Sequence, residues 1–171
     1  MKYILFLSFL FTLFTGCSAK HQELKTVQKV DVNKYLGTWY EIARYDNFFE
    51  KGCSDISATY SLRKDGKINV ENKCTKDGKI DIAIGEAYNI DESFSKLKVS
   101  FFWPFYGNYQ IIMLDEKYSY VVIGEPKREY FWILSRTSIL DEKILIEILQ
   151  KMPSYGYSKD KLIYPKHNHN N

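Results

Sequence analysis

The sequence predicts an all-β domain: an eight-stranded antiparallel up-and-down β-barrel with one C-terminal α-helix packed outside and a short ninth strand. Short runs of alternating apolar and polar residues recur from residue 37 to residue 135. The intervals between them are too short for the crossover helices that a parallel sheet requires. Eight strands in meander order must close or leave two exposed edges, and closure leaves an interior that holds one small ligand.

Length and composition fit one domain. The chain has 171 residues, of which 45% are hydrophobic, enough for one core and too few for two ordinary domains. A net charge of +3, from 24 basic and 21 acidic residues, gives no reason to expect a nucleic-acid partner. The histidines are His21, His167 and His169, near the chain ends, so we expect no histidine-based catalytic site, no metal site and no cofactor.

The strands follow from alternation and turn chemistry. Residues 56–62 alternate before the turn Lys64-Asp65-Gly66-Lys67, and alternation resumes at 68–71. Asp-Gly between two alternating runs is a strong hairpin signal. The same tetrapeptide recurs at 76–79. Further apolar runs follow at 80–84, 96–101, 109–114, 120–123 and 130–134.

One helix is predicted after the strands. Ser138 is the expected N-cap, and Asp141 and Glu142 suit the positive first turn. Pro153 and Gly156 end the helix. Its apolar face consists of Ile144, Leu145, Ile148, Leu149 and Met152, which we expect to pack on the outside of the barrel. Residues 161–164 are predicted to return as the ninth, edge strand.

The N-terminus indicates an exported, lipid-anchored protein. The apolar run at 3–14 is too short to span a bilayer and typical of a signal peptide. It ends in Thr15-Gly16-Cys17, which resembles a bacterial lipobox, in which the cysteine is acylated with palmitate-type chains. We predict a lipoprotein signal peptide over 1–16, a tether over 17–32, the domain over 33–165 and a flexible tail over 166–171. An ordinary signal peptide with an unmodified Cys17 is the alternative.

Two cysteines remain once Cys17 is assigned to lipid. We expect a Cys53–Cys74 disulfide in a compartment that permits such bonds, with two buried free thiols as the alternative. A two-residue turn at Asp65-Gly66 would place Ser57, and not Cys53, opposite Cys74. The bond therefore requires Cys53 to fold back, or a bulge in the strand.

Three segments resemble the bacterial outer-membrane lipocalins, in the same order along the chain. They are residues 35–44, which contain Gly37-Thr38-Trp39, residues 98–107, and residues 132–137. The resemblance implies that Trp39 plugs the closed end of the barrel and that Arg136 lies across its ring. A guanidinium over an indole stabilises a fold by about 0.5–2 kcal/mol, so this pair is structural and not catalytic.

Strand alternation predicts the lining of the ligand pocket. The inward-facing side chains are Ile56, Ala58, Tyr60, Leu62, Ile68, Val70, Leu97, Val99, Phe101, Tyr130, Trp132 and Leu134. Residues 80–90, 109–114 and 120–123 are apolar on both faces in places, so their inward faces stay unassigned. Glu41 shares the parity of Trp39, and we expect it to pair with a neighbouring arginine because an unpaired buried carboxylate is costly.

The resemblance implies a binding protein and not an enzyme. We expect it to store or transport a fatty acid or lysophospholipid for membrane maintenance, anchored in the outer membrane through its N-terminal acyl chains and facing the periplasm. A structural envelope lipoprotein with a filled barrel, or a haem or tetrapyrrole binder, is the alternative. The expected state is a monomer or weak homodimer. An aromatic rim at Phe102, Trp103 and Phe105 is suited to contact a second copy or a membrane.

Overall fold

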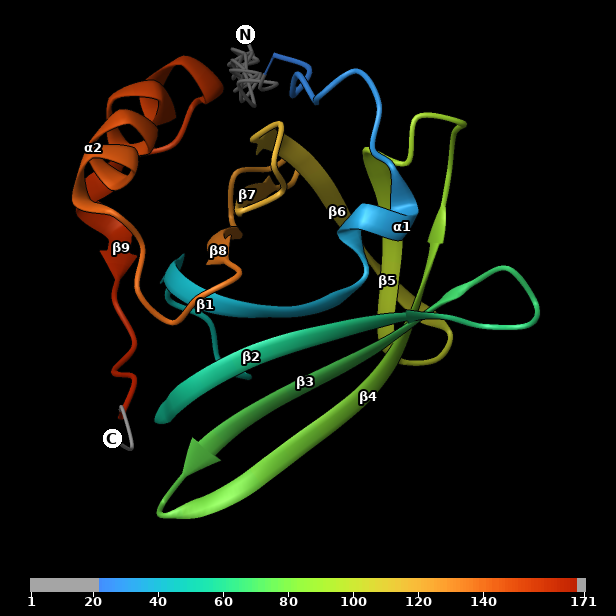
Figure 1. Ribbon diagram of the computed structural model, residues 1–171, viewed down its shortest axis with the longest axis horizontal. Helices are drawn as coiled ribbons and strands as arrows, with labels where there is room; N and C mark the ends of the chain where they lie inside the picture. The colour runs from blue at the N-terminus through green and yellow to red at the C-terminus, as the bar shows by residue number, and fades with distance from the viewer. Residues whose placement is uncertain (1–21, 169–171) are drawn as a thin grey trace, which may run out of the picture.

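The computed structural model describes residues 22–168, so the signal peptide, Cys17 and His169 lie outside the described residues (Figure 1). The helices are α1 (Val32–Tyr35) and α2 (Glu142–Lys151), with two 3-10 turns, η1 (Met152–Tyr155) and η2 (Lys159–Lys161). The strands are β1 (Gly37–Tyr45), β2 (Cys53–Leu62), β3 (Ile68–Lys76), β4 (Lys79–Asn89), β5 (Lys96–Phe102), β6 (Phe105–Leu114), β7 (Tyr120–Gly124), β8 (Phe131–Ser135) and β9 (Leu162–Ile163).

The first eight strands close into a barrel, which confirms the predicted fold. Each pairs antiparallel with the next, and β1 pairs with both β2 and β8. The ninth strand pairs with the end of β1, where Arg44 lies opposite Ile163. Helix α2 stands beside the barrel at the left of Figure 1. The short helix α1, which the sequence did not lead us to expect, precedes β1.

The barrel has two different ends. Because consecutive strands alternate in direction, the connections at 63–67, 90–95 and 115–119 lie at the same end as α1. We call this the closed end. The connections at 46–52, 77–78, 103–104 and 125–130 lie at the opposite end, which we call the mouth.

Two hydrophobic clusters share the barrel wall. One lies inside the barrel and is described below with the site. The other lies between the outer wall and α2, where Phe131 and Ile133 of β8 pack with Ile148 and Met152. The helix is capped by Asp141, whose carboxylate accepts hydrogen bonds from the backbone N–H groups of residues 143 and 144. The predicted cap at Ser138 is therefore wrong: helical backbone begins three residues later than that cap requires.

The described part of the expected tether is not free. Leu24 and Val30 are buried, and the segment runs along the outside of the barrel towards α1 (Figure 1). The Val27 N–H donates to the carbonyl of Ile111 at 3.0 Å, and the Val30 N–H donates to the carbonyl of Ser93 at 2.8 Å. Leu24 packs in the outer cluster, and Val30, with Val27 beside it, packs against the interior cluster, so three apolar side chains and two backbone hydrogen bonds hold this segment on the barrel.

The described part of the expected flexible tail is also held. The Lys166 carbonyl accepts a hydrogen bond from the Asp55 N–H at 2.8 Å. His167 Nε2 lies 2.6 Å from the carbonyl oxygen of Glu41, and the Asn168 N–H donates to the Asp55 carboxylate at 2.6 Å. Residues 166–168 thus have backbone and carboxylate partners on β1 and β2.

The Cys53–Cys74 disulfide is confirmed, with the two Cα atoms 5.6 Å apart. The register of β2 against β3 shifts between Ser54 and Ser57, and Asp55 has a positive φ of 50°. Ser57 lies opposite Lys73 and not Cys74, so the register expected from a two-residue turn is wrong. The expected bulge is present, and it places Cys53 opposite Lys76, close enough to bond to Cys74 across the strand pair.

Candidate ligand-binding site

The closed end of the barrel is sealed around Trp39, which is fully buried. The guanidinium carbon of Arg136 lies 3.7 Å from the centroid of the Trp39 ring. The Trp39 indole N–H donates to the Tyr35 carbonyl at 2.8 Å. The Arg136 guanidinium donates hydrogen bonds to the backbone carbonyls of Lys34 at 2.7 Å, Tyr35 at 3.1 Å, Leu36 at 2.9 Å and Thr38 at 2.8 Å. One cation thus ties the α1 turn and the start of β1 to the end of β8.

Three tyrosines meet above this seal. The Tyr109 hydroxyl lies 2.6 Å from the Tyr35 hydroxyl and 3.0 Å from the Tyr60 hydroxyl. Burial raises the pKa of Tyr60 to about 12 and raises the pKa values of Tyr35 and Tyr109 well above 10. All three hydroxyls stay protonated at neutral pH and form an uncharged polar floor. Sequence alternation identified only Tyr60, because Tyr35 precedes the strands and Tyr109 lies in a strand whose face was unassigned.

Most of the predicted pocket residues meet inside the barrel. The interior cluster contains seven of them: Ala58, Tyr60, Ile68, Val70, Val99, Trp132 and Leu134. Ile56 and Leu97 are also buried, although they belong to neither hydrophobic cluster. Tyr130 stacks on Trp132 towards the mouth, with ring centroids 5.8 Å apart.

Two of the predicted pocket residues are exposed. Leu62 is 53% exposed because it lies beyond Tyr60, the last residue of β2 that pairs with β1, so the β2–β3 hairpin projects past the barrel. Phe101 is 43% exposed at the mouth end of β5. It packs over Gly85 of β4, where an added Cβ would lie 2.8 Å from its ring. The prediction that these two side chains line an enclosed pocket is wrong.

Besides Tyr35 and Tyr109, the sequence reasoning missed further residues of the interior cluster, among them Ala87, Ile111, Val121 and Ile123. These four come from the strands whose faces alternation left unassigned. In β6 the register shifts between Ile111 and Met113, so Ile111 faces inward while Ile112 and Met113 both belong to the outer cluster. Simple alternation cannot describe such a strand.

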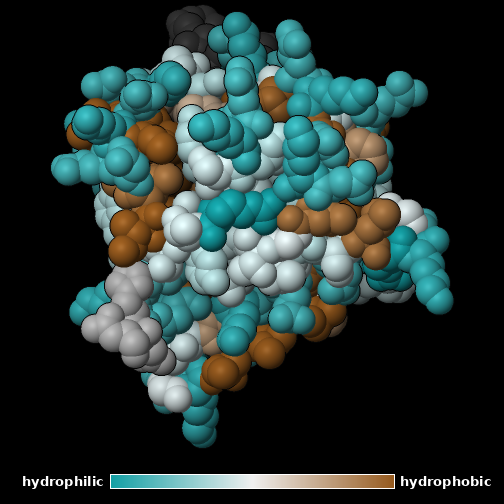
Figure 2. Space-filling view, in the orientation of Figure 1, coloured by the Kyte–Doolittle hydropathy of each residue, from teal (hydrophilic) through white to brown (hydrophobic). Residues whose placement is uncertain are grey.

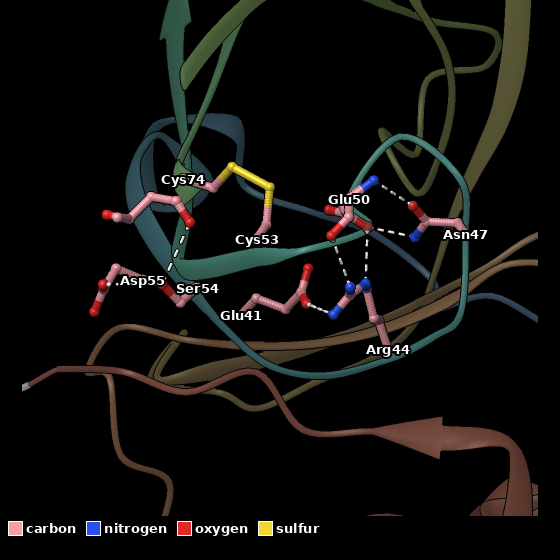
Figure 3. The surroundings of a disulfide bond; sticks show 9 residues. Glu41, Arg44, Asn47, Glu50, Cys53, Ser54, Asp55 and Cys74 are labelled. Atoms are coloured by element: carbon pink, nitrogen blue, oxygen red, sulfur yellow. Dashed lines mark hydrogen bonds and ion pairs between the residues drawn. A yellow bond between two sulfur atoms is a disulfide. The ribbon is translucent and has the colours of Figure 1, made fainter. Parts of the chain in front are cut away.

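A buried ionic cluster lies inside the mouth (Figure 3). The Arg44 guanidinium forms ion pairs with Glu41 at 3.0 Å and with Glu50 at 3.3 Å. Glu50 also accepts hydrogen bonds from the Asn47 amide and, at 3.3 Å, from the Trp132 indole. The pairing of Glu41 with an arginine is confirmed. The Cys53–Cys74 bond lies beside the cluster and ties β2 to β3 there.

The cluster depends on a second bulge. The register of β1 against β8 shifts between Glu41 and Ala43. As a result, Ala43 and Tyr45 join the outer cluster while Arg44 turns to Glu41 on the inner side. Without this extra residue, alternation would place Arg44 on the opposite face from Glu41.

The cluster contains two carboxylates and one guanidinium. Burial raises the pKa of Glu41 well above its ordinary value, the Glu50 carboxylate raises it further, and Arg44 opposes both effects. The cluster can therefore hold a proton as well as donate and accept hydrogen bonds. A further polar atom, Asn72 Oδ1, is buried without a hydrogen-bond partner among the described residues. It lies on the same strand face as Val70 and opposite Ala58. The interior thus combines apolar walls with polar groups at two levels.

The surface hollows of residues 22–168 are separate from the barrel interior. A hollow of ≈ 550 Å³ is lined by Tyr45 and Arg128 among others. A second hollow, of ≈ 250 Å³, is lined by Ile84 and Trp103 among others. Neither hollow is lined by residues of the interior cluster. Within this range, no three His, Cys, Asp or Glu side chains are grouped to hold a metal ion. No helix of this range has the length and apolar character needed to cross a bilayer.

Comparison with known proteins gives the same fold. Residues 30–167 match the model of the lipocalin-like domain. The chain is 40% identical over 164 residues to outer membrane lipoprotein Blc of Vibrio cholerae, covering 94% of this chain and 96% of that protein. It is 46% identical over 159 residues to the Blc protein of Citrobacter freundii, covering 90% of each. The structure of insecticyanin from the tobacco hornworm Manduca sexta superposes with a TM-score of 0.70 at 18% identity, covering 87% of each chain. The chain belongs to the lipocalin family.

Proposed function

We propose that the chain is a lipid-anchored lipocalin of the outer membrane that holds one fatty acid or lysophospholipid in its barrel, for storage or transport of the lipid. The observation that carries the proposal is the division of the interior into apolar walls and a buried polar cluster near the mouth. An acyl chain suits the apolar walls, and a polar headgroup suits the polar cluster. Burial of the chain supplies the affinity, at about 25 cal/mol per Å².

The polar groups set the expected orientation of the ligand. Glu41, Arg44 and Glu50 lie between the Trp39 seal and the mouth. A headgroup there would exchange hydrogen bonds with the ionic cluster, while the acyl chain passes Asn72 towards the tyrosine floor. The orphaned Asn72 oxygen suits a hydroxyl of the ligand or a water molecule held beneath it.

The anchor is proposed on Cys17, which follows the apolar run in a lipobox-like context. Relatives that match nearly the whole chain are named outer membrane lipoproteins, which supports the proposal. Two or three acyl chains at about 0.8 kcal/mol per CH₂ hold a protein stably in a bilayer. Replacing Cys17 with Ala is expected to move the protein out of the membrane fraction or leave its precursor uncleaved. Wild-type fractionation and maturation of that variant would refute acylation.

The proposed ligand is tested by identifying the lipid that copurifies with the protein. Mature protein purified from membranes is extracted with organic solvent, and the extract is analysed by mass spectrometry. We expect one fatty acid or lysophospholipid per chain, in excess over the bulk membrane lipids. An extract with the composition of the bulk membrane would refute the proposal.

A structural envelope lipoprotein with a filled barrel is the second candidate. The packing of Tyr35, Tyr60 and Tyr109 across the interior favours it, because these side chains occupy space that a ligand would use. The two candidates differ in the extraction experiment, since a filled barrel carries no stoichiometric lipid.

A further inference from the structure

Exposed aromatic side chains gather around the mouth. Phe48 and Phe49 come from the β1–β2 connection, and Phe102, Trp103 and Phe105 come from the tip of the β5–β6 hairpin. We call these five residues the mouth rim. Phe48 is 82% exposed, Phe102 76% and Trp103 78%. The Phe102 and Phe105 rings stack on each other with centroids 6.2 Å apart.

The rim continues onto the outer wall of the barrel. Ile80, Ile82 and Ile84 form an exposed row along β4, and the brown atoms along the lower edge of Figure 2 follow this strand. A shallow hollow joins Ile84 to Phe102 and Trp103. Monomeric proteins rarely expose a large contiguous apolar surface unless something covers it. Full burial of one such side chain contributes about 1.5–3 kcal/mol.

The N-terminal segment, which leads back to Cys17, begins near the mouth of the barrel. The Gln22 carbonyl accepts a hydrogen bond from Arg128 at 2.7 Å, and Arg128 belongs to the β7–β8 connection at the mouth. From there the chain follows the outer wall to α1 at the closed end, held by the contacts of Val27 and Val30. The described chain therefore begins on the mouth side of the barrel.

The distance to the anchor is short. Cys17 lies five residues before Gln22, and five residues span at most about 18 Å when fully extended. An acylated Cys17 thus keeps the bilayer within this distance of the mouth. A free tether over 17–32 would have imposed no such limit, since its remaining residues would have added to the reach.

We propose that the mouth rim inserts into the phospholipid surface in which Cys17 is anchored, so that the barrel opens onto the bilayer. This inference rests on the proposed acylation of Cys17. It gives the amphiphile a path between membrane and barrel that avoids bulk water. Hydrocarbon in the bilayer interface is the partner whose chemistry matches a ring of exposed aromatic side chains.

Charge indicates the kind of lipid. The connections around the mouth, counted together with the one residue that flanks each on either side (45–53, 76–79, 102–105 and 124–131), contain five basic and five acidic residues. Their charges cancel, so attraction to anionic headgroups does not supply the attachment. We expect insertion into neutral phosphatidylcholine that resists added salt.

The test uses tryptophan fluorescence of the mature, acylated full chain in phosphatidylcholine vesicles with and without brominated acyl chains. The chain has three tryptophans: Trp39 is buried, Trp132 is partly buried in the interior cluster, and Trp103 is the exposed probe at the rim. We expect brominated lipid to quench the emission, and Trp103→Phe to lose that quenching.

A matched pair of variants tests whether the rim causes the insertion. Phe102→Glu introduces a charge beside the probe and is expected to abolish the Trp103 quenching. Ile139→Glu introduces the same charge at a side chain that is 64% exposed and follows β8 at the closed end, and quenching should remain as in the wild type. Equal quenching in the two variants would overturn the proposal.

The possible failures are distinguishable. Protein that floats with the vesicles but is not quenched overturns the docking and leaves the anchor and the ligand intact. Protein that does not float overturns acylation and the docking with it. If the wild type is unquenched and Phe102→Glu converts a dimer to a monomer in sedimentation, the rim binds a second copy of this chain instead of a membrane.

Discussion

Removal of the Arg136 side chain should destabilise the barrel more than any ordinary surface substitution. Arg136 is partly exposed, yet it donates four hydrogen bonds of 3.1 Å or less to backbone carbonyls and covers the Trp39 ring. In Arg136→Ala those carbonyls lose a charged donor, and the indole loses its cover.

The expected loss is worked from these contacts. Hydrogen bonds to a charged group contribute about 1.5–3 kcal/mol each when buried, and less where water replaces them. The cation–π contact adds about 0.5–2 kcal/mol, and contributions that share one side chain are not additive. We expect Arg136→Ala to lower the free energy of unfolding by about 3–4 kcal/mol. Arg136→Lys keeps the charge but not the planar fork of donors, and we expect about half that loss.

The assay is urea unfolding followed by tryptophan fluorescence, with the free energy extrapolated to water. A loss of this size lowers the melting temperature by roughly 6–16 °C in a domain of about 150 residues. If Arg136→Ala and Arg136→Lys both lie within about 0.5 kcal/mol of the wild type, the seal does not hold the closed end.

Three further perturbations test other parts of the fold. Replacing Cys53 and Cys74 with Ser removes a crosslink over 21 residues and should cost about 3 kcal/mol in denaturant titrations; no loss would show that the bulge holds without it. Gly85→Ala places a Cβ 2.5 Å from a backbone carbonyl oxygen and should cost about 1–3 kcal/mol, whereas a neutral result would contradict the close packing. The pKa of Glu41 is raised by burial, so its contribution to stability is full below its ordinary value of 4.5 and is lost as pH rises through the raised value. As the pH rises from 4.5 to neutrality, the free energy of unfolding of Glu41→Gln should therefore fall less than that of the wild type. Parallel curves of unfolding free energy against pH would refute the raised pKa of Glu41.

The fold was predictable because its main signals are long and regular. The alternation around Asp65-Gly66 identified a hairpin, the apolar face up to Met152 identified the outer helix, and the cysteine count identified the disulfide. Each of these patterns extends over many residues or follows from simple counting. Nine of the twelve predicted pocket residues are buried or belong to the interior cluster for the same reason.

The remaining features depend on single residues that leave no periodic trace. One bulge near Ile42 turns Arg44 to the inside, and one near Ile112 changes the inward face of β6. Leu62 fits the inward pattern of β2, yet β2 extends two residues beyond Tyr60, where its pairing with β1 ends. The docking of Leu24 on the barrel wall depends on tertiary contacts alone.

The central proposal, one amphiphile inside the barrel, is tested most directly by binding stoichiometry in a variant whose interior is filled. Ala58 lies inside the barrel opposite Trp39, whereas Ser61 is exposed on the same strand. Delipidated mature protein is titrated calorimetrically with a fatty acid or a lysophospholipid. We expect one molecule to bind per wild-type chain and per Ser61→Trp chain, and none to bind Ala58→Trp that retains its cooperative unfolding transition. Equal binding by Ala58→Trp would place the ligand outside the barrel, and no binding by the wild type would leave the filled barrel as the account of this protein.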